Sequence, residues 1–390
     1  MGRVEPRRAR LVGDPGVEYT LIETASDLDA YVSRHLGTTS YALDTEFEQR
    51  TTYHPRLALL QICCDDEVAL VDPTVVDSSP LGALLDSPAV AVVHAAVNDL
   101  DLVESAVGVR PRHLLDTEVG GQLLGRPRTS LAALTRDYLE LRLDKSEQTR
   151  DWLLRPLPER ALRYAAADVA YLVELSERLS EDLVSCDRAE AWREESDAVL
   201  RDDSAGDELA LWWRVKGLSR APSEVRLRGQ YLCVARDTLA RQRDLVRTRV
   251  LSDEDLLEVA FRPARLATLS VSRDEVVRQH LEGALDAAAG ADPDELWPAD
   301  ADVSDGARGR RLALMRLVAK EVADEWSLSS ATLATHRDLV RFERGLPSRL
   351  DRVWRQRAFG DQMSLIRENR GALGLLEGRL RVVEMNLDHA

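Results

Sequence analysis

The amino-acid sequence predicts an α/β domain followed by two small all-helical domains. Apolar strand-like runs alternate with helical patterns over about the first 185 residues, and from about residue 205 the strand pattern disappears. An acidic stretch with two prolines, at 286–305, then divides the helical remainder. A chain of 390 residues is long enough for two to three domains of roughly 100–200 residues each. The expected parts are a disordered N-terminus at 1–16, the α/β domain at 17–200, helical domains at 207–286 and 306–378, an acidic linker at 287–305 and a C-terminal tail at 379–390.

The elements of the α/β domain follow from the periodicity of apolar residues. The first helix is expected at 26–36, with Ser26 as its N-cap, because Leu28, Tyr31 and Val32 recur at helical spacing. The runs with strand character are Glu18–Ile22, Tyr41–Phe47, Leu57–Cys63, Glu67–Asp72 and Val90–His94. Further helices are expected at 81–85, at 98–107 and through 130–183, the last with breaks near 141–143 and 156–158.

The composition excludes several classes of protein. No window approaches the roughly 20 apolar residues of a membrane span, and the basic N-terminus lacks the apolar core of a secretory signal. The four cysteines form no C-x-x-C pair, which argues against a zinc knuckle and against a disulfide scaffold. We therefore expect a cytoplasmic protein with no membrane partner.

The net charge of −16 argues against nucleic-acid binding, but this average hides a basic segment at 212–250. The segment has ten Lys or Arg residues against three acids, and Trp212, Trp213 and Tyr231 lie among them. Such a mixture suits contact with a nucleic-acid backbone combined with base stacking. A solvated helix face with its aromatic residues in the core is the alternative interpretation. The cations expected to bind substrate are Arg241, Arg243 and Arg247.

Three short patterns place acidic residues on regular elements. Asp44 and Glu46 are two residues apart on a strand, so both carboxylates point to the same face. Asp99 stands near the start of a helix, where an anion is stabilised. Tyr164 and Asp168 are four residues apart on a helix and share one side of it. Each pattern alone is weak, since a cap or a surface contact would also explain it.

Together the four acids form a set of oxygen-only ligands. Such ligands suit Mg²⁺ or Mn²⁺ rather than zinc. Two such ions about 3.5–4 Å apart would clamp an in-line attack of water on a phosphodiester. Tyr164 cannot act as a strong base near neutral pH, so its hydroxyl would orient the water. Asp101 is the nearest competitor of Asp99 for a place in this set.

A more specific pattern extends over LDTEF (43–47), TYHPRLALLQI (52–62), HAAVNDL (94–100), LDT (115–117), LDKSEQTRDWLLRPL (143–157) and RYAAADVAYL (163–172). These stretches resemble the ribonuclease D family of DEDD-type 3′–5′ exonucleases, over roughly residues 18–185. Members of the histidine subgroup have a histidine five residues before the last aspartate of the set. This chain has Arg163 at that position, which indicates the tyrosine subgroup. The helical remainder resembles the two HRDC domains of that family. The resemblance implies a ribonuclease-H-like fold, an α/β arrangement with a mixed five-stranded sheet and flanking helices.

The resemblance also implies an activity. It implies a metal-dependent 3′–5′ exoribonuclease that releases 5′-mononucleotides during 3′-end maturation of tRNA and other structured RNAs. Two divalent ions, Mg²⁺ or Mn²⁺, would be bound by Asp44, Glu46, Asp99 and Asp168, with Asp44 bridging both ions and Tyr164 positioning the water. The partner is then RNA with a free 3′ end that is single-stranded at the site. No obligate protein partner is evident.

Several points stay open at the level of sequence. His94 and Lys145 are candidate substrate contacts, although a structural role is an alternative for His94. Glu48 and Arg50 stand in a stretch that departs from the family pattern, which leaves the detailed substrate contacts open. A DNA 3′–5′ exonuclease of the same fold is an alternative function. A catalytically inactive RNA-binding adaptor is another, but the presence of all four acids and the tyrosine argues against it.

Overall fold

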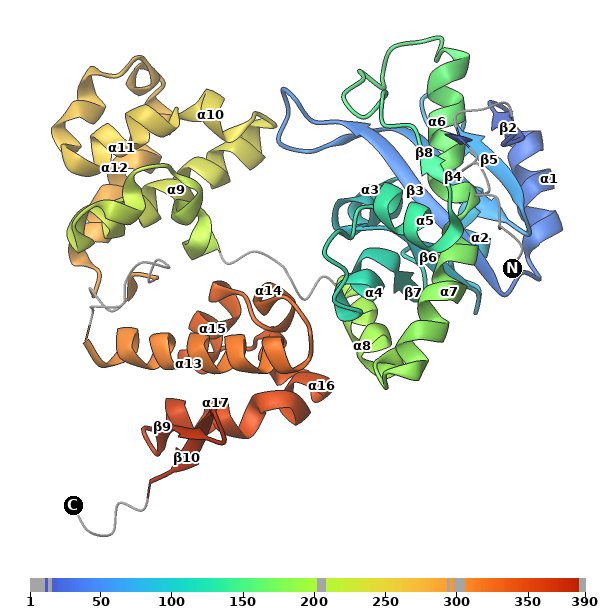
Figure 1. Ribbon diagram of the computed structural model, residues 1–390. Coiled ribbons are helices and arrows are strands. Elements are labelled where there is room, and N and C mark those ends of the chain that lie inside the picture. Colours follow the sequence, from blue (N-terminus) through green and yellow to red (C-terminus); the bar gives the residue numbers. More distant parts are fainter. Residues whose placement is uncertain (1–10, 13–15, 202–207, 293–294, 298–305, 386–390) are drawn as a thin grey trace. The chain divides into compact units, whose positions relative to one another are not determined.

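The chain divides into two compact units in this computed structural model, which describes residues 11–12, 16–201, 208–292, 295–297 and 306–385 (Figure 1). The first unit comprises 1–48, 55–204 and 326–332. The second comprises 49–54, 205–325 and 333–390. None of the helices in the described part of the chain is both long and apolar enough to cross a membrane.

The first unit is built on a sheet of six strands, β2 (Tyr19–Ile22), β3 (Ser40–Glu48), β4 (Arg56–Cys64), β5 (Glu67–Val71), β6 (Val90–Val93) and β7 (His113–Asp116). Their order is β2-β5-β4-β3-β6-β7. β4 runs antiparallel to β3 and β5, whereas the other neighbours are parallel. The predicted mixed sheet is confirmed. It has one strand more than the five expected, because the short apolar run before Asp116 pairs with β6.

Helices cover both faces of this sheet. On one face Leu43 packs in a cluster with α1 (Ala25–His35) and α3 (Val97–Val107). On the other face Ala42 packs in a cluster with α6 (Glu159–Ala170). Because side chains alternate along a strand, Asp44 lies on the same face as Ala42, the face covered by α6.

The other elements of the first unit largely follow the predicted order. Helix α1 is capped by Thr24, whose hydroxyl accepts a hydrogen bond from Asp27 N, so the helix starts slightly earlier than the predicted cap at Ser26. Leu11–Val12 forms a short strand, β1, paired with β8 (Arg142–Leu143), which corrects the prediction of disorder at these two residues. Residues 1–10 and 13–15 lie outside the described part of the chain. The remaining helices are α2 (Gly82–Leu85), α4 (Thr117–Leu123), α5 (Leu131–Leu139), α7 (Leu172–Ser185) and α8 (Ala189–Leu200).

An ion pair fixes the segment between β8 and α6 to the sheet. Arg155 donates to both carboxylate oxygens of Asp72, at 2.6 and 2.9 Å, and to Ala58 O at 2.6 Å. Burial alone would raise the pKa of Asp72, but hydrogen bonds from Arg155 and Thr74 outweigh it and lower that pKa. Arg155 therefore acts as an anchor for the segment that carries Lys145.

The second unit is predominantly helical, as predicted. Its first part packs around α9 (Ser223–Arg243), whose Leu232 and Leu239 are fully buried together with Trp212. The helices around it are α10 (Arg247–Val250), α11 (Asp253–Phe261), α12 (Glu275–Gly290) and the 3₁₀ turns η2 (Glu208–Arg214), η3 (Leu218–Arg220), η4 (Pro263–Thr268) and η5 (Ser270–Arg273). Its second part contains α13 (Gly306–Glu325), α14 (Ser330–Leu333), α15 (His336–Glu343), α16 (Val353–Arg355) and α17 (Asp361–Arg367), with short helical turns at 349–351 and 356–360.

Two parts of the second unit differ from the prediction. Trp297, in the expected linker, is buried, and its backbone N–H donates to Gln230 Oε1 at 2.9 Å, so this part of the linker is packed on α9. The linker positions 293–294 and 298–305 lie outside the described residues. Strands β9 (Gly371–Leu376) and β10 (Arg379–Glu384) form a hairpin where a helix end and a tail were expected. The Glu377–Gly378 turn has positive φ at both residues, which suits a tight two-residue hairpin.

The four cysteines are free and differ in exposure. Cys63, Cys64 and Cys233 are buried, whereas Cys186 is exposed just after α7. Burial raises the pKa of each buried thiol to about 12.

Candidate functional site

The predicted acids of β3 lie just beyond the point where β6 stops pairing. β3 pairs with β6 only over Ser40–Ala42, and β6 ends at Val93. Asp44 and Glu46 therefore continue along an edge of β3 that has no backbone partner on that side among the described residues. This unpaired edge of β3 leaves room for side chains from the helices.

Asp99 lies in the first turn of α3, near the unpaired edge of β3. Its carboxylate accepts a hydrogen bond from the hydroxyl of Thr45, the residue between the two acids of β3. Asp101, the competitor, instead pairs with Arg110 Nη2 at 2.5 Å and its side chain is 64% exposed. The structure thus brings Asp99, and not Asp101, to the other acids.

Tyr164 and Asp168 lie on α6, the helix that covers the face of the sheet on which Asp44 lies. The helix lies close to the sheet because the residues on its inner side, including Ala161 and Ala165, are small and fully buried. The Tyr164 ring lies against buried Trp152, with 6.0 Å between the ring centroids. The nearby Tyr164 hydroxyl lowers the pKa of Asp168, but burial outweighs this effect.

Some of these groups border a cavity of about 220 Å³, whereas Glu46 and Asp99 are not among the residues that line it. Its lining includes Asp44, Tyr164 and Asp168 together with the two candidate substrate contacts, His94 and Lys145. The other lining residues are Ser130, Leu131, Ala132, Leu143, Asp144 and Gln148. Sequence reasoning did not select Ser130 or Gln148; the only signal for Gln148 was its place in the stretch that also holds Lys145.

Burial and mutual repulsion dominate the electrostatics of the cavity. Burial, followed by the charges of Asp168 and Asp99, raises the pKa of Glu46 to about 9. Burial raises the pKa of Asp168 to about 7. The pKa of Asp44 is also raised, by burial and then by the other three acids, and burial raises that of Asp99. Carboxylates that raise one another's pKa in this way lack a compensating positive charge.

This donor set fits a hard divalent cation. Carboxylate oxygens are the ligands that Mg²⁺ and Mn²⁺ prefer, and a divalent ion would supply the positive charge that the four acids lack. Among the described residues, no three His, Cys, Asp or Glu side chains are close enough together to hold an ion as they stand.

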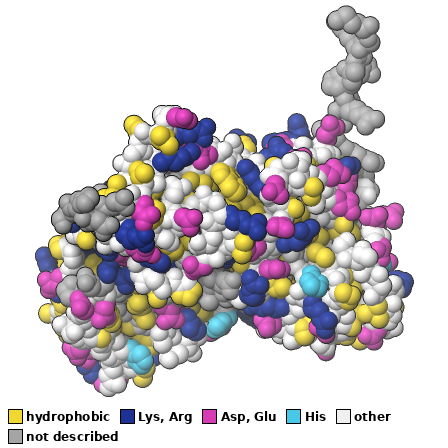
Figure 2. All heavy atoms as spheres, turned by 90° about the horizontal axis from the view of Figure 1, so that it is seen from below, with side chains coloured by type: hydrophobic (Ala, Val, Ile, Leu, Met, Phe, Trp, Pro, Cys, Tyr) yellow, Lys and Arg dark blue, Asp and Glu magenta, His cyan; other side chains and the backbone are white. Residues whose placement is uncertain are grey.

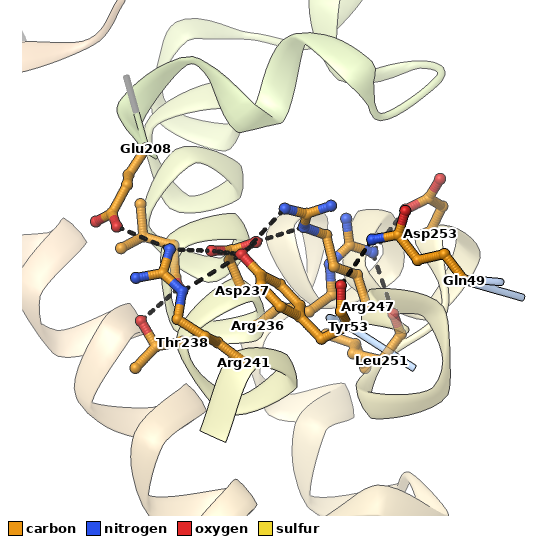
Figure 3. A network of polar contacts seen from close by, with 11 residues as sticks. Gln49, Tyr53, Glu208, Arg236, Asp237, Thr238, Arg241, Arg247, Leu251 and Asp253 are labelled. Carbon is orange, nitrogen blue, oxygen red and sulfur yellow. Dashed lines mark hydrogen bonds and ion pairs between the residues drawn. The ribbon is translucent and has the colours of Figure 1, made fainter. Parts of the chain in front are cut away.

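The arginines expected to bind substrate lie in the second unit, where each pairs with an acid. Arg241 and Arg247 both donate to Asp237, and the hydroxyl of Tyr53 donates to the same carboxylate at 3.0 Å (Figure 3). Arg243 pairs with Asp274 at 2.6 Å. The Asp237 side chain is only 4% exposed, so this carboxylate depends on its partners. Much of the positive charge in the basic segment is therefore compensated within the unit.

Four other cations of the basic segment differ from these arginines in the part of the chain that the structure describes. Arg214, Lys216, Arg220 and Arg249 are exposed, and none of them forms an ion pair with a described residue. On the face shown in Figure 2, Lys and Arg side chains are interspersed with Asp and Glu rather than gathered in one patch. The sequence count of cations alone did not distinguish the free ones from the paired ones.

Comparison with known proteins yields one consistent family. A family model described as a 3′–5′ exonuclease matches residues 19–184. A ribonuclease D from Gluconacetobacter diazotrophicus is 32% identical over 376 residues, which cover 91% of this chain and 94% of the relative. The ribonuclease D of Escherichia coli is 32% identical over 264 residues, or 65% of this chain and 69% of the relative.

Solved structures give the same result. The crystal structure of E. coli RNase D, described as an exoribonuclease involved in structured RNA processing, matches with a TM-score of 0.73. The match has 27% sequence identity and covers 90% of this chain and 99% of that protein. The catalytic core of RRP6 from Trypanosoma brucei matches with a TM-score of 0.56 and 25% identity, over 70% of this chain and 81% of that protein.

Asp44→Asn is expected to weaken the binding of Mn²⁺, because it removes a ligand of the ion. Loss of a residue that only supports a ligand costs roughly 10- to 100-fold in metal affinity, and the loss in Asp44→Asn should be larger. The substitution should not destabilise the ion-free protein, since it removes a buried carboxyl group whose charged form is disfavoured by burial and by the neighbouring acids. Calorimetric titration with Mn²⁺ measures the first effect and thermal unfolding in EDTA the second. Asp101→Asn is the matched control, with wild-type Mn²⁺ affinity. Equal affinity of Asp44→Asn and wild type would remove Asp44 from the ligand set.

Proposed function

Because the chain belongs to the ribonuclease D family and is a 3′–5′ exoribonuclease, we propose that it hydrolyses phosphodiester bonds with two divalent ions and releases 5′-mononucleotides. The observation that supports this most directly is the convergence of residues on one cavity. Asp44 of β3 and the Tyr164–Asp168 pair of α6 line this cavity, and Glu46 and Asp99 lie near enough to raise the pKa of Asp44.

Different residues of the site would bind the metal ions, orient the water and contact the phosphate. Asp44, Glu46, Asp99 and Asp168 would hold two Mg²⁺ or Mn²⁺ ions, which would activate water and stabilise the charge that develops on the phosphate. Burial raises the pKa of Tyr164 further above its usual value, so the hydroxyl keeps its proton near neutral pH. Tyr164 then orients the attacking water by hydrogen bonding, and does not remove its proton. Lys145 lines the same cavity and can donate to a phosphate oxygen.

The proposed substrate is RNA with a free 3′ end that is single-stranded at the site. The relation to E. coli RNase D, an exoribonuclease involved in structured RNA processing, supports trimming of structured RNAs, including tRNA precursors. We place this activity in the cytoplasm, and the free cysteines are consistent with a reducing compartment. The helical domains would contribute affinity for the RNA backbone, as HRDC-like domains.

Incubation of the purified protein with end-labelled RNA and DNA of equal sequence tests the function. With Mg²⁺ or Mn²⁺ we expect a ladder of products shortened one nucleotide at a time from the 3′ end of RNA, and no products in EDTA. Thin-layer chromatography should identify the released species as 5′-mononucleotides. A ladder from DNA alone would favour the DNA exonuclease, and no degradation of either polymer would favour the inactive adaptor.

Tyr164→Phe is expected to lower kcat by roughly 100-fold, because it deletes the hydroxyl that orients the water and keeps the ring against Trp152. The Kd for RNA should not change, and the affinity for Mn²⁺ should fall less than in Asp44→Asn, because the hydroxyl is not itself a metal ligand. Single-turnover kinetics and equilibrium binding separate these quantities. A loss of thermal stability with full specific activity would make Tyr164 a structural residue.

The exposed cations that pair with no acid among the described residues should matter more for RNA affinity than the paired ones. Replacing Arg214, Lys216 and Arg220 by Gln should flatten the dependence of log K on log salt by about 2 if all three contact phosphates. Replacing Arg241, Arg243 and Arg247 by Ala should instead destabilise the second unit, because Asp237 loses two partners. Salt-dependent binding and thermal unfolding of both triple variants check this. An unchanged slope in the Gln variant would remove these three cations from the RNA contact.

A further inference from the structure

His94 is held in one orientation by a short chain of hydrogen bonds. Its Nδ1 atom lies 2.9 Å from the hydroxyl oxygen of Thr117. That hydroxyl donates its single proton to Val93 O at 3.0 Å. A hydroxyl that has already donated can only accept from the ring, so Nδ1 of His94 carries a proton. Thr117 is fully buried, which protects this arrangement from water.

The opposite ring nitrogen is therefore a hydrogen-bond acceptor. Burial lowers the pKa of His94 to about 4, so the ring is neutral near pH 7 and Nε2 has a free lone pair. Nε2 has no hydrogen-bond partner among the residues that the structure describes. His94 also borders the cavity that contains Asp44, Tyr164 and Asp168.

The backbone next to His94 is held in an unusual conformation. Ala95 has φ of +57°, a left-handed value that is unfavourable for a residue with a Cβ. Its N–H donates to Asp116 Oδ1 at 3.0 Å, and the same carboxylate caps the N-terminus of α4. Strained backbone that the surroundings hold in place is concentrated at functional sites. Asp116 and Thr117 thus fix both the main chain and the ring of His94.

We propose that Nε2 of His94 accepts a hydrogen bond from a hydroxyl of the 3′-terminal ribose. This inference rests on the proposed function, in which the phosphate attached to that ribose lies at the four acids. Phosphate oxygens have no proton to donate to Nε2, whereas the 2′- and 3′-hydroxyls do. Donors on the bases differ between nucleotides, and an enzyme that removes successive nucleotides benefits from a contact that all of them share. Asp116 and Thr117 are positioning residues for His94.

Three RNA oligonucleotides that differ only in the last sugar test this contact. One ends in an ordinary ribonucleotide, one in a 2′-deoxynucleotide and one in a 3′-deoxynucleotide. The wild-type protein is expected to cleave one of the two deoxy-terminated RNAs roughly tenfold more slowly than the ribo-terminated RNA, as for loss of one hydrogen bond. His94→Phe should lose a similar factor on the ribo-terminated RNA and show no further loss on that deoxy RNA, which identifies the hydroxyl. Binding of the same RNAs in EDTA should show the same pattern without turnover.

Further variants distinguish the contact from a structural effect. His94→Gln, which can place an acceptor oxygen near Nε2, should recover part of the discrimination. Thr117→Val should lose part of it, because the ring proton is no longer fixed on Nδ1. His113→Ala, on the exposed start of β7, is the control and should behave as wild type. Equal losses of His94→Phe on all three RNAs, or no loss on any, would overturn the inference. Failure of the wild-type protein to shorten RNA from its 3′ end would instead overturn the proposed function.

Discussion

Repulsion among four carboxylates is the constraint around which the first unit is arranged. Asp44, Glu46, Asp99 and Asp168 are partly buried, and each would be more stable in water or beside a cation. The fold holds them together by other means. The hydroxyl of Thr45 orients Asp99, the small inner side of α6 brings Asp168 close to β3, and Arg155 anchors the segment that closes the cavity. The packing energy of the two apolar layers makes this accumulation of charge possible.

The parts of the site that are encoded locally could be predicted from sequence. Periodicity predicts that Asp44 and Glu46 share a face of β3 and that Tyr164 and Asp168 share a side of α6, whereas their assignment to one site came from the resemblance to the family. Asp99 was less certain, because Asp101 has the same chemistry two residues away. The hydrogen bond from Thr45 to Asp99 and the ion pair between Asp101 and Arg110 separate them, and both contacts depend on tertiary structure.

Features that depend on partners distant in sequence could not be predicted in this way. The cations of the basic segment look alike in sequence, yet Arg241 and Arg247 share Asp237 with a tyrosine that lies 184 positions away from that acid. The C-terminal hairpin was missed because its strands follow a long helical pattern and its turn is Glu-Gly rather than a stronger hairpin signal. The proton position on His94 depends on Val93 O, through a hydroxyl that belongs to another element.

The unequal exposure of the cysteines allows selective chemical labelling of the folded protein. Thiol reagents attack the thiolate, and burial keeps Cys63, Cys64 and Cys233 both protonated and covered near neutral pH. Cys186, exposed after α7, is the one cysteine that a reagent in solution can reach while the chain stays folded. A maleimide fluorophore would therefore label the native protein at a single, known position without any engineered substitution, and the appearance of further labelling would report unfolding.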